Sequence, residues 1–206
     1  MRLGALILAG GRSVRMGRPK EWLPFGGETL LGRIGRTLLE VAAPVLVLAR
    51  DHEQELPPLP AAVGKLVDQR RDAGPLAGLT QGLDHLATVH GFAAGDAVLL
   101  TACDLPFLDA GFVRGLTTHL AGHDVVLPIR DGQEEPLAAI YRLGLRAAAH
   151  ELLQRGAGSP RALAAAATTC RLAGEALASL DPSGRCLWNL NTQTDYERAV
   201  AALADG

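Results

Sequence analysis

The sequence predicts an α/β fold with a mostly parallel, twisted sheet flanked by helices. Apolar runs of strand length alternate along the chain with stretches whose apolar residues recur at helical spacing, and Gly, Pro, Asp or charged residues separate them. Such alternation requires parallel strands joined by helical crossovers. With 206 residues, of which 48% are hydrophobic, the chain is long enough to bury a substantial core around such a sheet.

The first half of the chain contains three expected strands and two expected helices. The strands are the apolar runs at Leu3–Leu8, 44–50 and Ala97–Ala102. The first helix covers 30–41, where apolar residues occupy positions 30, 31, 34, 38, 39 and 41. The second covers 76–89, with apolar residues at 76, 79, 83, 86 and 89. Both sets follow the period of a helix that buries one face.

The second half continues the alternation. Strands are expected at 124–129 and 137–142, and helices at 109–120, 145–154 and 161–167. A last helix is expected over 194–203, because Thr194 suits the N-cap and Glu197 stands three residues later, as in a capping box. Segment 51–64 and the Ala-rich remainder of 156–180 carry little information about structure.

Composition excludes several classes of function. The formal net charge of −2 and a pI near 6.3 leave no positive surplus to follow a nucleic acid backbone. The apolar run before Gly10 is too short to span a membrane, and RSVRMGRPK follows it in place of a signal-peptide cleavage site. Cys103, Cys170 and Cys186 form neither an even set nor a Cys-x-x-Cys pair. We therefore expect free thiols, a cytoplasmic location and a small-molecule partner.

A glycine-rich basic loop follows the first expected strand. Gly10 and Gly11 allow the backbone to approach a ligand closely, because no Cβ intervenes. Four cations follow within nine residues, at positions 12, 15, 18 and 20. Cations and backbone N–H groups at the carboxyl end of a parallel strand suit a triphosphate. By charge alone the loop fits a solvated basic segment equally well, and it matches neither the Walker A motif nor a G-x-G-x-x-G fingerprint.

The segment from Leu8 to Lys20, LAGGRSVRMGRPK, resembles the nucleotide-binding motif of a nucleotidyltransferase family. That family includes sugar-nucleotide pyrophosphorylases and the molybdenum cofactor guanylyl- and cytidylyltransferases. The resemblance implies a Rossmann-like nucleotidyltransferase fold, and it places Arg15 and Lys20 on the phosphates as catalytic groups. Nucleotide contacts are implied for Leu8, Ala9, Gly10, Gly11 and Lys20.

Asp104, which follows the apolar run at Ala97–Ala102, is the second candidate. A carboxylate at a strand end, on the same sheet edge as the glycine-rich loop, suits Mg²⁺, which binds one or two carboxylates together with substrate phosphate oxygens. Aspartates at strand ends also start turns or cap helices. In the family that the loop resembles, this aspartate is the magnesium ligand. The resemblance therefore implies that Asp104 is catalytic and nucleotide-binding, with Mg²⁺ as cofactor.

Asp68 and the segment 72–79, DAGPLAGL, form the third candidate. Gly74 and Pro75 open an expected helix, whose N-terminal N–H groups and dipole suit a phosphate or a base. A tight loop with proline in the first turn explains the same letters without a ligand. An Asp followed by G-P-L-A-G-L resembles the molybdenum cofactor guanylyltransferases. That resemblance implies nucleotide contacts for Asp68 and Gly74.

Two later segments resemble the acceptor half of the same family: EEPLAAIY, which begins at position 134, and LWNLNTQTDYERA, which begins at position 187. Asn189 and Asn191 are two residues apart, so in an extended segment both amides face one side. Amides suit the donors and acceptors of a pterin or a metal-bound phosphate, although a simple turn before the last helix fits as well. The resemblance implies Pro136, Asn189 and Asn191 as acceptor-binding residues. The glutamates at 134 and 135 are less specific, because charged residues before a strand are usually just exposed.

The resemblance spans nearly the whole chain. With no internal repeat or linker, we expect one domain, 1–206, with a nucleotide half at about 1–105 and an acceptor half at about 106–206. The implied reaction transfers GMP from GTP to molybdopterin carrying molybdenum and releases pyrophosphate. Molybdenum cofactor carrier or target enzymes are further candidate partners, whereas nucleic acid and membranes are not. Three alternatives remain open: a cytidylyltransferase acting on the same pterin, a sugar-phosphate nucleotidyltransferase, and a non-catalytic nucleotide sensor.

Overall fold

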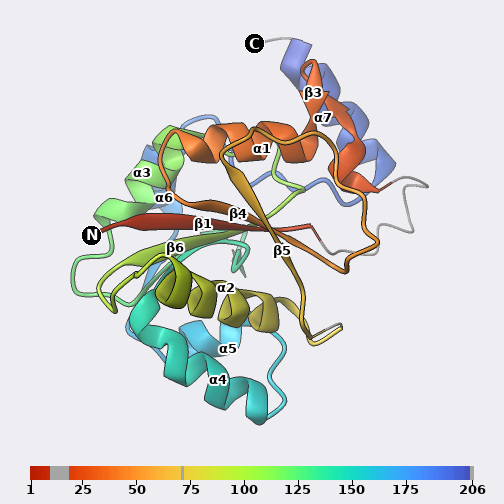
Figure 1. The fold of residues 1–206 in the computed structure, drawn as a ribbon. Helices are drawn as coiled ribbons and strands as arrows, with labels where there is room; N and C mark the ends of the chain where they lie inside the picture. Colours follow the sequence, from red (N-terminus) through yellow and green to blue (C-terminus); the bar gives the residue numbers. More distant parts are fainter. Residues whose placement is uncertain (10–18, 71, 205–206) are drawn as a thin grey trace.

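Figure 1 shows the computed structural model, which describes residues 1–9, 19–70 and 72–204. A mixed sheet forms its centre, with strands in the order β10, β7, β9, β6, β1, β4, β5 and with β8 paired to β7. In chain order these strands are β1 (Leu3–Leu8), β4 (Val45–Ala49), β5 (Val63–Val67), β6 (Ala97–Ala102), β7 (Val125–Arg130), β8 (Gln133–Glu134), β9 (Ala138–Arg142) and β10 (Thr169–Leu172). A separate hairpin consists of β2 (Pro24–Phe25) and β3 (Glu28–Thr29).

Helices cover both faces of the sheet (Figure 1). One face carries α1 (Leu30–Leu39), α3 (Ala110–Thr118) and α6 (Gly174–Leu180), and the other carries α2 (Pro75–Val89), α4 (Arg146–Gln154) and α5 (Pro160–Ala165). The 3₁₀ turns are η2 (Lys20–Trp22) and η3 (Leu143–Leu145), and α7 (Gln193–Ala204) is the last helix. Side chains of β1 alternate between the faces, because Ala5 and Ile7 pack on the α1 side and Leu6 on the α2 side. The expected α/β fold is confirmed.

Strand β9 runs against its neighbours. Parallel pairing joins β1 to β4 and β6, β4 to β5, and β7 to β10, whereas β9 pairs antiparallel with both β6 and β7. The expectation of parallel strands therefore does not hold for this element. Only seven residues, 131–137, lie between β7 and β9, and a parallel crossover needs about a dozen or more. Asp131 and Gly132, with φ of 50° and 75°, turn the chain back instead.

The last helix begins earlier than the sequence predicts. α7 starts at Gln193, and its capping box is formed by Thr192 and Asp195. The Thr192 hydroxyl accepts from Asp195 N at 3.1 Å, and the Asp195 carboxylate accepts from Thr192 N at 2.8 Å. The prediction of Thr194 as N-cap is therefore wrong by two residues. Two Thr-x-x-acid patterns overlap here, and the structure uses the first.

Two strands and one helix lie where the sequence carries little information. β5 is an edge strand whose residues are mostly half-buried, and it contains Gly64 and Lys65, which are unusual in strands. Gly64 allows close packing on β4, because a Cβ there would lie 2.9 Å from Leu46 Cδ2. β10 is the opposite edge strand, and no residue of α6 is fully buried. Weak burial gives these elements weak hydrophobic patterns.

Two expectations from composition concern the cysteines and membranes. The thiols of Cys103, Cys170 and Cys186 are free. Within residues 1–9, 19–70 and 72–204, none of the helices is both long and apolar enough to cross a membrane.

Candidate functional site

The carboxyl ends of β1 and β6 meet at one edge of the sheet. The two strands are parallel neighbours in register, with Leu8 opposite Ala102. Ala9, which is buried just after β1, donates its N–H to Leu48 O at 3.0 Å. Ala9 and Cys103, the residues that follow these two strands, therefore leave the sheet at the same edge. Three predicted site residues that come after Ala9 lie outside the described residues: Gly10, Gly11 and Arg15.

Lys20 and Asp104 form an ion pair at this edge. Lys20 opens the turn η2, and its Nζ lies 3.2 Å from Asp104 Oδ2. Their side chains are 16% and 20% exposed, so both charges are largely removed from water while a ligand can still reach them. A partly buried pair of this kind interacts more strongly than a pair on the open surface. The structure thus brings together two predicted catalytic residues that lie 84 positions apart in the sequence.

The segment before α7 completes the contact. Leu190 N donates to the backbone oxygen of Asp104 at 2.9 Å, and the Leu190 side chain is fully buried. Asn191 then places its Oδ1 3.5 Å from Lys20 Nζ. Asn191, Lys20 and Asp104 therefore form one group, although Asn191 comes 171 residues after Lys20.

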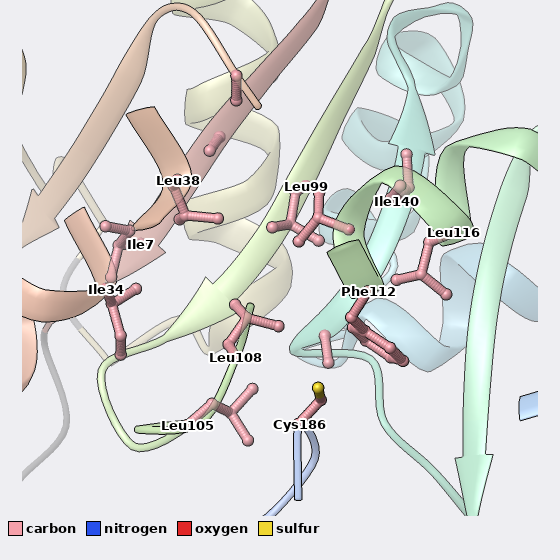
Figure 2. Packing of buried hydrophobic residues seen from close by; sticks show 14 of the residues in the cluster. Ile7, Ile34, Leu38, Leu99, Leu105, Leu108, Phe112, Leu116, Ile140 and Cys186 are labelled. Atoms are coloured by element: carbon pink, nitrogen blue, oxygen red, sulfur yellow. The ribbon is translucent and has the colours of Figure 1, made fainter. Parts of the chain in front are cut away.

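The Asp104 loop and the C-terminal segment share one hydrophobic core. Leu105 and Leu108, which follow Asp104, are 2% and 4% exposed, and Figure 2 shows both pointing into the cluster that Phe112 of α3 helps to form. Cys186 enters the same cluster from the C-terminal segment (Figure 2). Close packing on both sides of Asp104 restricts its backbone. This anchoring gives the ion pair a fixed position.

Asn189 contacts a different acidic group. Its Nδ2 donates to Glu135 Oε2 at 3.5 Å. Burial raises the pKa of the Glu135 carboxyl above its usual value, and the negative charge of Asp104 adds to that rise. Pro136 follows, and its backbone oxygen accepts a hydrogen bond from the buried Tyr141 hydroxyl at 3.0 Å. Pro136 and Asn189 therefore lie on either side of Glu135, a residue that the sequence pattern did not single out.

Gln54 supports the base of the glycine-rich loop, although no sequence motif pointed to it. Its buried Nε2 donates to Ala9 O at 2.8 Å and to Glu21 Oε1 at 2.7 Å. Its Oε1 accepts from Arg50 N at 2.6 Å. One amide therefore joins the ends of β1 and β4 to the turn that carries Lys20. The nearest signal in the sequence is Asp51 at a strand end, whose Oδ1 accepts from Gln54 N at 2.8 Å.

Asp68 lies on another part of the same sheet edge. It follows the edge strand β5, and its Oδ1 accepts from Arg70 N at 2.8 Å. It lines a cleft of about 590 Å³ beside α2, which is within the usual size of small-molecule sites. Among the described residues, neither Asp68 nor Gly74 makes a hydrogen bond to Lys20, Asp104 or the two asparagines.

Gly74 precedes α2 in a conformation that favours glycine. Its φ and ψ are 82° and 172°, a region that other residues rarely adopt. A Cβ at this position would lie 2.5 Å from Gly158 O, which itself accepts from Leu76 N at 3.0 Å. Ala77 N donates to Gly74 O at 3.1 Å. Two N–H groups of the first helical turn are thus bonded within the protein, and the backbone geometry alone explains the glycine.

We expect Gly74→Ala to destabilise the protein more than Gly156→Ala. Gly156 has a similar φ of 83°, but nothing lies within 4 Å of the position of an added Cβ. Positive φ should therefore cost both variants about 1–2 kcal/mol, and the contact with Gly158 should cost Gly74→Ala at least about 1 kcal/mol more. Urea unfolding of both variants measures the difference. Equal losses would mean that the loop around Gly158 moves freely away.

Comparison with known proteins identifies the family. A family model described as "MobA-like NTP transferase domain" matches residues 5–171. A probable molybdenum cofactor guanylyltransferase from Mycolicibacterium paratuberculosis is 34% identical over 99% of this chain and 98% of its own length. Molybdopterin-guanine dinucleotide biosynthesis protein A from Archaeoglobus fulgidus has a TM-score of 0.75 at 22% identity, with 100% of both chains covered. 2-C-methyl-D-erythritol 4-phosphate cytidylyltransferase from Thermus thermophilus has a TM-score of 0.71 at 20% identity, with 99% of this chain and 100% of the other covered.

The two solved structures show that the fold is that of nucleotidyltransferases, in agreement with the fold expected from the loop motif. The matched sequence includes the last four residues of β1, all of β6 and both residues of the Lys20–Asp104 ion pair. The chain belongs to the MobA-like NTP transferase domain family, and it is a nucleotidyltransferase.

Proposed function

We propose that this nucleotidyltransferase is a molybdenum cofactor guanylyltransferase. It transfers GMP from GTP to molybdopterin carrying molybdenum, and the products are the guanine dinucleotide cofactor and pyrophosphate. One observation carries the proposal: the 3.2 Å contact of Lys20 with Asp104, beside Asn191, where β1 and β6 end. Membership of a family whose curated relatives are named as guanylyltransferases supports the choice of substrates.

The chemistry sets what the residues must do. A phosphate of the pterin attacks the α-phosphorus of GTP, so nucleophile and electrophile are both anionic. Catalysis then depends on positioning and charge neutralisation, and no general base is needed. Lys20 and Arg15 would stabilise the charge that develops on the departing pyrophosphate. Nucleotide contacts are proposed for Leu8, Ala9, Gly10, Gly11, Asp68 and Gly74, and acceptor contacts for Pro136, Asn189 and Asn191.

Asp104 suits Mg²⁺. Its carboxylate is one-fifth exposed and lies in a group that also offers the Asn191 amide oxygen. Mg²⁺ prefers oxygen ligands and usually takes one or two from the protein, with substrate phosphates and water supplying the others. When bound, Mg²⁺ would neutralise charge on the reacting phosphates. Lys20 neutralises the Asp104 carboxylate in this structure, and its ammonium group would be available to the phosphates if Asp104 held Mg²⁺.

A nucleotide panel tests the proposal. The melting temperature is measured with GTP, CTP, ATP or UTP in the presence of Mg²⁺, and pyrophosphate release is then measured with molybdopterin. GTP at about 100 times its Kd should add roughly 2.7 kcal/mol of stability, and the other nucleotides should add less. A preference for CTP would indicate a cytidylyltransferase, and turnover with hexose 1-phosphates a sugar-phosphate enzyme. GTP binding without pyrophosphate release would indicate a sensor.

The remaining features of the proposal concern organisation and context. The chain would act as one domain, with a nucleotide half at about 1–105 and an acceptor half at about 106–206. The group around Lys20 contains residues of both halves, which agrees with a single site shared between them. Free thiols, such as the three of this chain, are typical of proteins in a reducing compartment, and we propose that the protein acts in the cytoplasm. Molybdenum cofactor carrier or target enzymes are proposed as partners that deliver the pterin or receive the product.

A further inference from the structure

We propose that Glu135 selects the acceptor by accepting two hydrogen bonds from its pterin ring, one from the 2-amino group and one from the neighbouring ring N–H. This inference rests on the proposed transfer to molybdopterin. It gives a specificity role to a residue that sequence patterns place among ordinary exposed charges before a strand.

The direction of β9 brings Glu135 to the reaction centre. Because β9 runs antiparallel to β6, it begins at the edge where β6 ends, with Ala138 opposite Thr101. Glu135 precedes Ala138 by three residues, and Asp104 follows Thr101 by three. A parallel β9 would have begun at the opposite edge of the sheet, about the length of a strand away.

The two adjacent glutamates occupy different environments. Glu134 belongs to β8 and pairs with Arg171 at 3.0 Å and with Arg161 at 3.9 Å. Glu135 is hydrogen-bonded to Asn189 instead, at 3.5 Å, while the positive charges of Arg130 and Arg161 act on its carboxyl without a hydrogen bond. Successive side chains of an extended chain point to opposite sides, which explains the separation. Only the second glutamate is directed toward the acceptor segment.

The backbone around Glu135 is held in place. Glu135 N donates to Pro128 O at 2.9 Å, and Glu135 O accepts from Ala138 N at 3.0 Å. The fully buried Tyr141 fixes the next residue through its bond to Pro136 O. Both backbone groups of Glu135 are therefore bonded, so its carboxylate is presented from a rigid turn. A preorganised group discriminates between ligands better than a mobile one.

A short segment links Glu135 to the reacting phosphates. Asn189 contacts Glu135, Leu190 is bonded to the Asp104 backbone, and Asn191 contacts Lys20. Three consecutive residues thus join the carboxylate to the ion pair, and the Cα atoms of Asn189 and Asn191 are at most about 7 Å apart. The side chains of these two residues add to that span, and an acceptor that matches it could place its phosphate at Lys20 and its ring at Glu135.

Charge explains which part of the acceptor Glu135 contacts. A carboxylate repels phosphates, so its partner must be a hydrogen-bond donor. In the described residues its side chain accepts one long hydrogen bond, although two carboxylate oxygens have room for about four. Burial raises the pKa of Glu135, because the charged carboxylate is poorly solvated there. For the same reason, hydrogen bonds from two adjacent donors would stabilise the carboxylate more than they would in water. The 2-amino group and adjacent N–H of a pterin form such a pair, which matches a carboxylate in two parallel bonds.

Guanine carries the same pair of donors, but the topology assigns the pterin to Glu135. The sheet order is β9, β6, β1, so β6 lies between the strand that follows Glu135 and the strand that leads into the nucleotide loop. Asn189, its side-chain partner, belongs to the segment proposed for the acceptor. If the base binds beside the segment that follows β1, as proposed, it and Glu135 would lie on opposite sides of the β6 end.

The kinetic test uses Glu135→Gln, with Glu134→Gln as the matched control. Pyrophosphate release is measured against metal-free molybdopterin at saturating GTP, and against GTP at saturating acceptor. Glu135→Gln should raise the KM for the acceptor about tenfold or more, as expected for losing bonds to a charged group, and change the KM for GTP by less than about twofold. Glu134→Gln should change neither constant. A rise in KM for GTP alone would overturn the proposal.

Direct binding gives a second test that does not depend on turnover. 6-Hydroxymethylpterin and the matching lumazine, which has an oxygen in place of the 2-amino group, are titrated by their own fluorescence. The wild type should prefer the pterin about tenfold or more, and Glu135→Gln should bring the ratio close to one, because its amide can donate to the oxygen. An unchanged ratio would overturn the inference. If Glu135→Gln melts well below the wild type, Glu135→Asp replaces it and should keep the preference while weakening binding.

These two tests separate the inference from the proposed function. A wild type that releases no pyrophosphate with any acceptor contradicts the guanylyltransferase proposal. The pterin to lumazine ratio still reports on Glu135 in that case, and a ratio near one in the wild type would then overturn the inference as well.

Discussion

Replacing Asp104 by alanine should lower kcat for pyrophosphate release by about 10²-fold or more while leaving the fold intact. The side chain is one-fifth exposed, so loss of its partly buried ion pair with Lys20 should cost some stability without unfolding the chain. The backbone oxygen that holds Leu190 remains. Loss of the carboxylate removes the group proposed to hold Mg²⁺ while charge moves between phosphates. The effect should therefore fall on kcat more than on KM.

A matched control separates this effect from a general loss of charge. Asp131→Asn removes an aspartate whose side chain is 89% exposed, at a position of positive φ that asparagine tolerates. Its kcat should stay within about twofold of the wild type, as is usual for surface changes. Rates for Asp104→Ala close to those of the wild type at saturating Mg²⁺ would remove Asp104 from the mechanism.

Lys20→Ala should lower kcat/KM for GTP by about 10²-fold. Its side chain is 16% exposed and its Nζ lies 3.2 Å from Asp104 Oδ2, so the ammonium group acts in surroundings where a charge is screened less than on the surface. Removing a charged donor from a developing negative charge costs about 2.7–4 kcal/mol in comparable sites. Steady-state rates over a range of GTP concentrations measure the loss.

Arg155 provides the control, because its side chain is 75% exposed and pairs with Glu151 at 3.8 Å on α4. Arg155→Ala should leave kcat/KM for GTP within about twofold. The double variant Lys20→Ala/Asp104→Ala should lose less than the product of the single losses, because the two groups act together. Additive losses would contradict a shared role for the ion pair.

The bounds of β1 and β6 could be predicted from the sequence to the residue, whereas the central strand β4 is one residue shorter at each end than expected. Four of the six residues of β1 and five of the six of β6 are buried, so each appears as a largely apolar run with polar limits. The edge strand β5 could not be found in this way, because VGKLV mixes a glycine and a lysine with half-buried valines. Pairing with β4 forms this strand, and no local preference of its residues predicts it.

The hydrophobicity of a strand does not show in which direction the strand runs within the sheet. The run that became β9 shows the same apolar character whichever way it points. The short connection from β7, with Asp131 and Gly132 at its turn, was the available signal. So short a connection indicates an antiparallel β9, which places Glu135 at the edge of the candidate site and not among ordinary exposed charges.

Candidate site residues could be chosen where a motif has several fixed positions. Lys20 and Asp104 were chosen in this way, and the structure places them in contact. Glu135 and Gln54 could not be chosen, because their importance depends on neighbours 54 and 45 residues away. Whether an acidic residue faces solvent or a site depends on the turn that presents it.

The bond between Leu190 and Asp104 has a consequence for protein synthesis. The ribosome synthesises β10 before residues 187–191. Every strand of the sheet therefore exists before Leu190 can bond to Asp104 and Asn191 can contact Lys20. The Leu187 and Leu190 side chains, which the structure buries, join the core only after that point. Proteolytic loss of the last helix and the segment before it would therefore remove part of the core together with the proposed acceptor contacts.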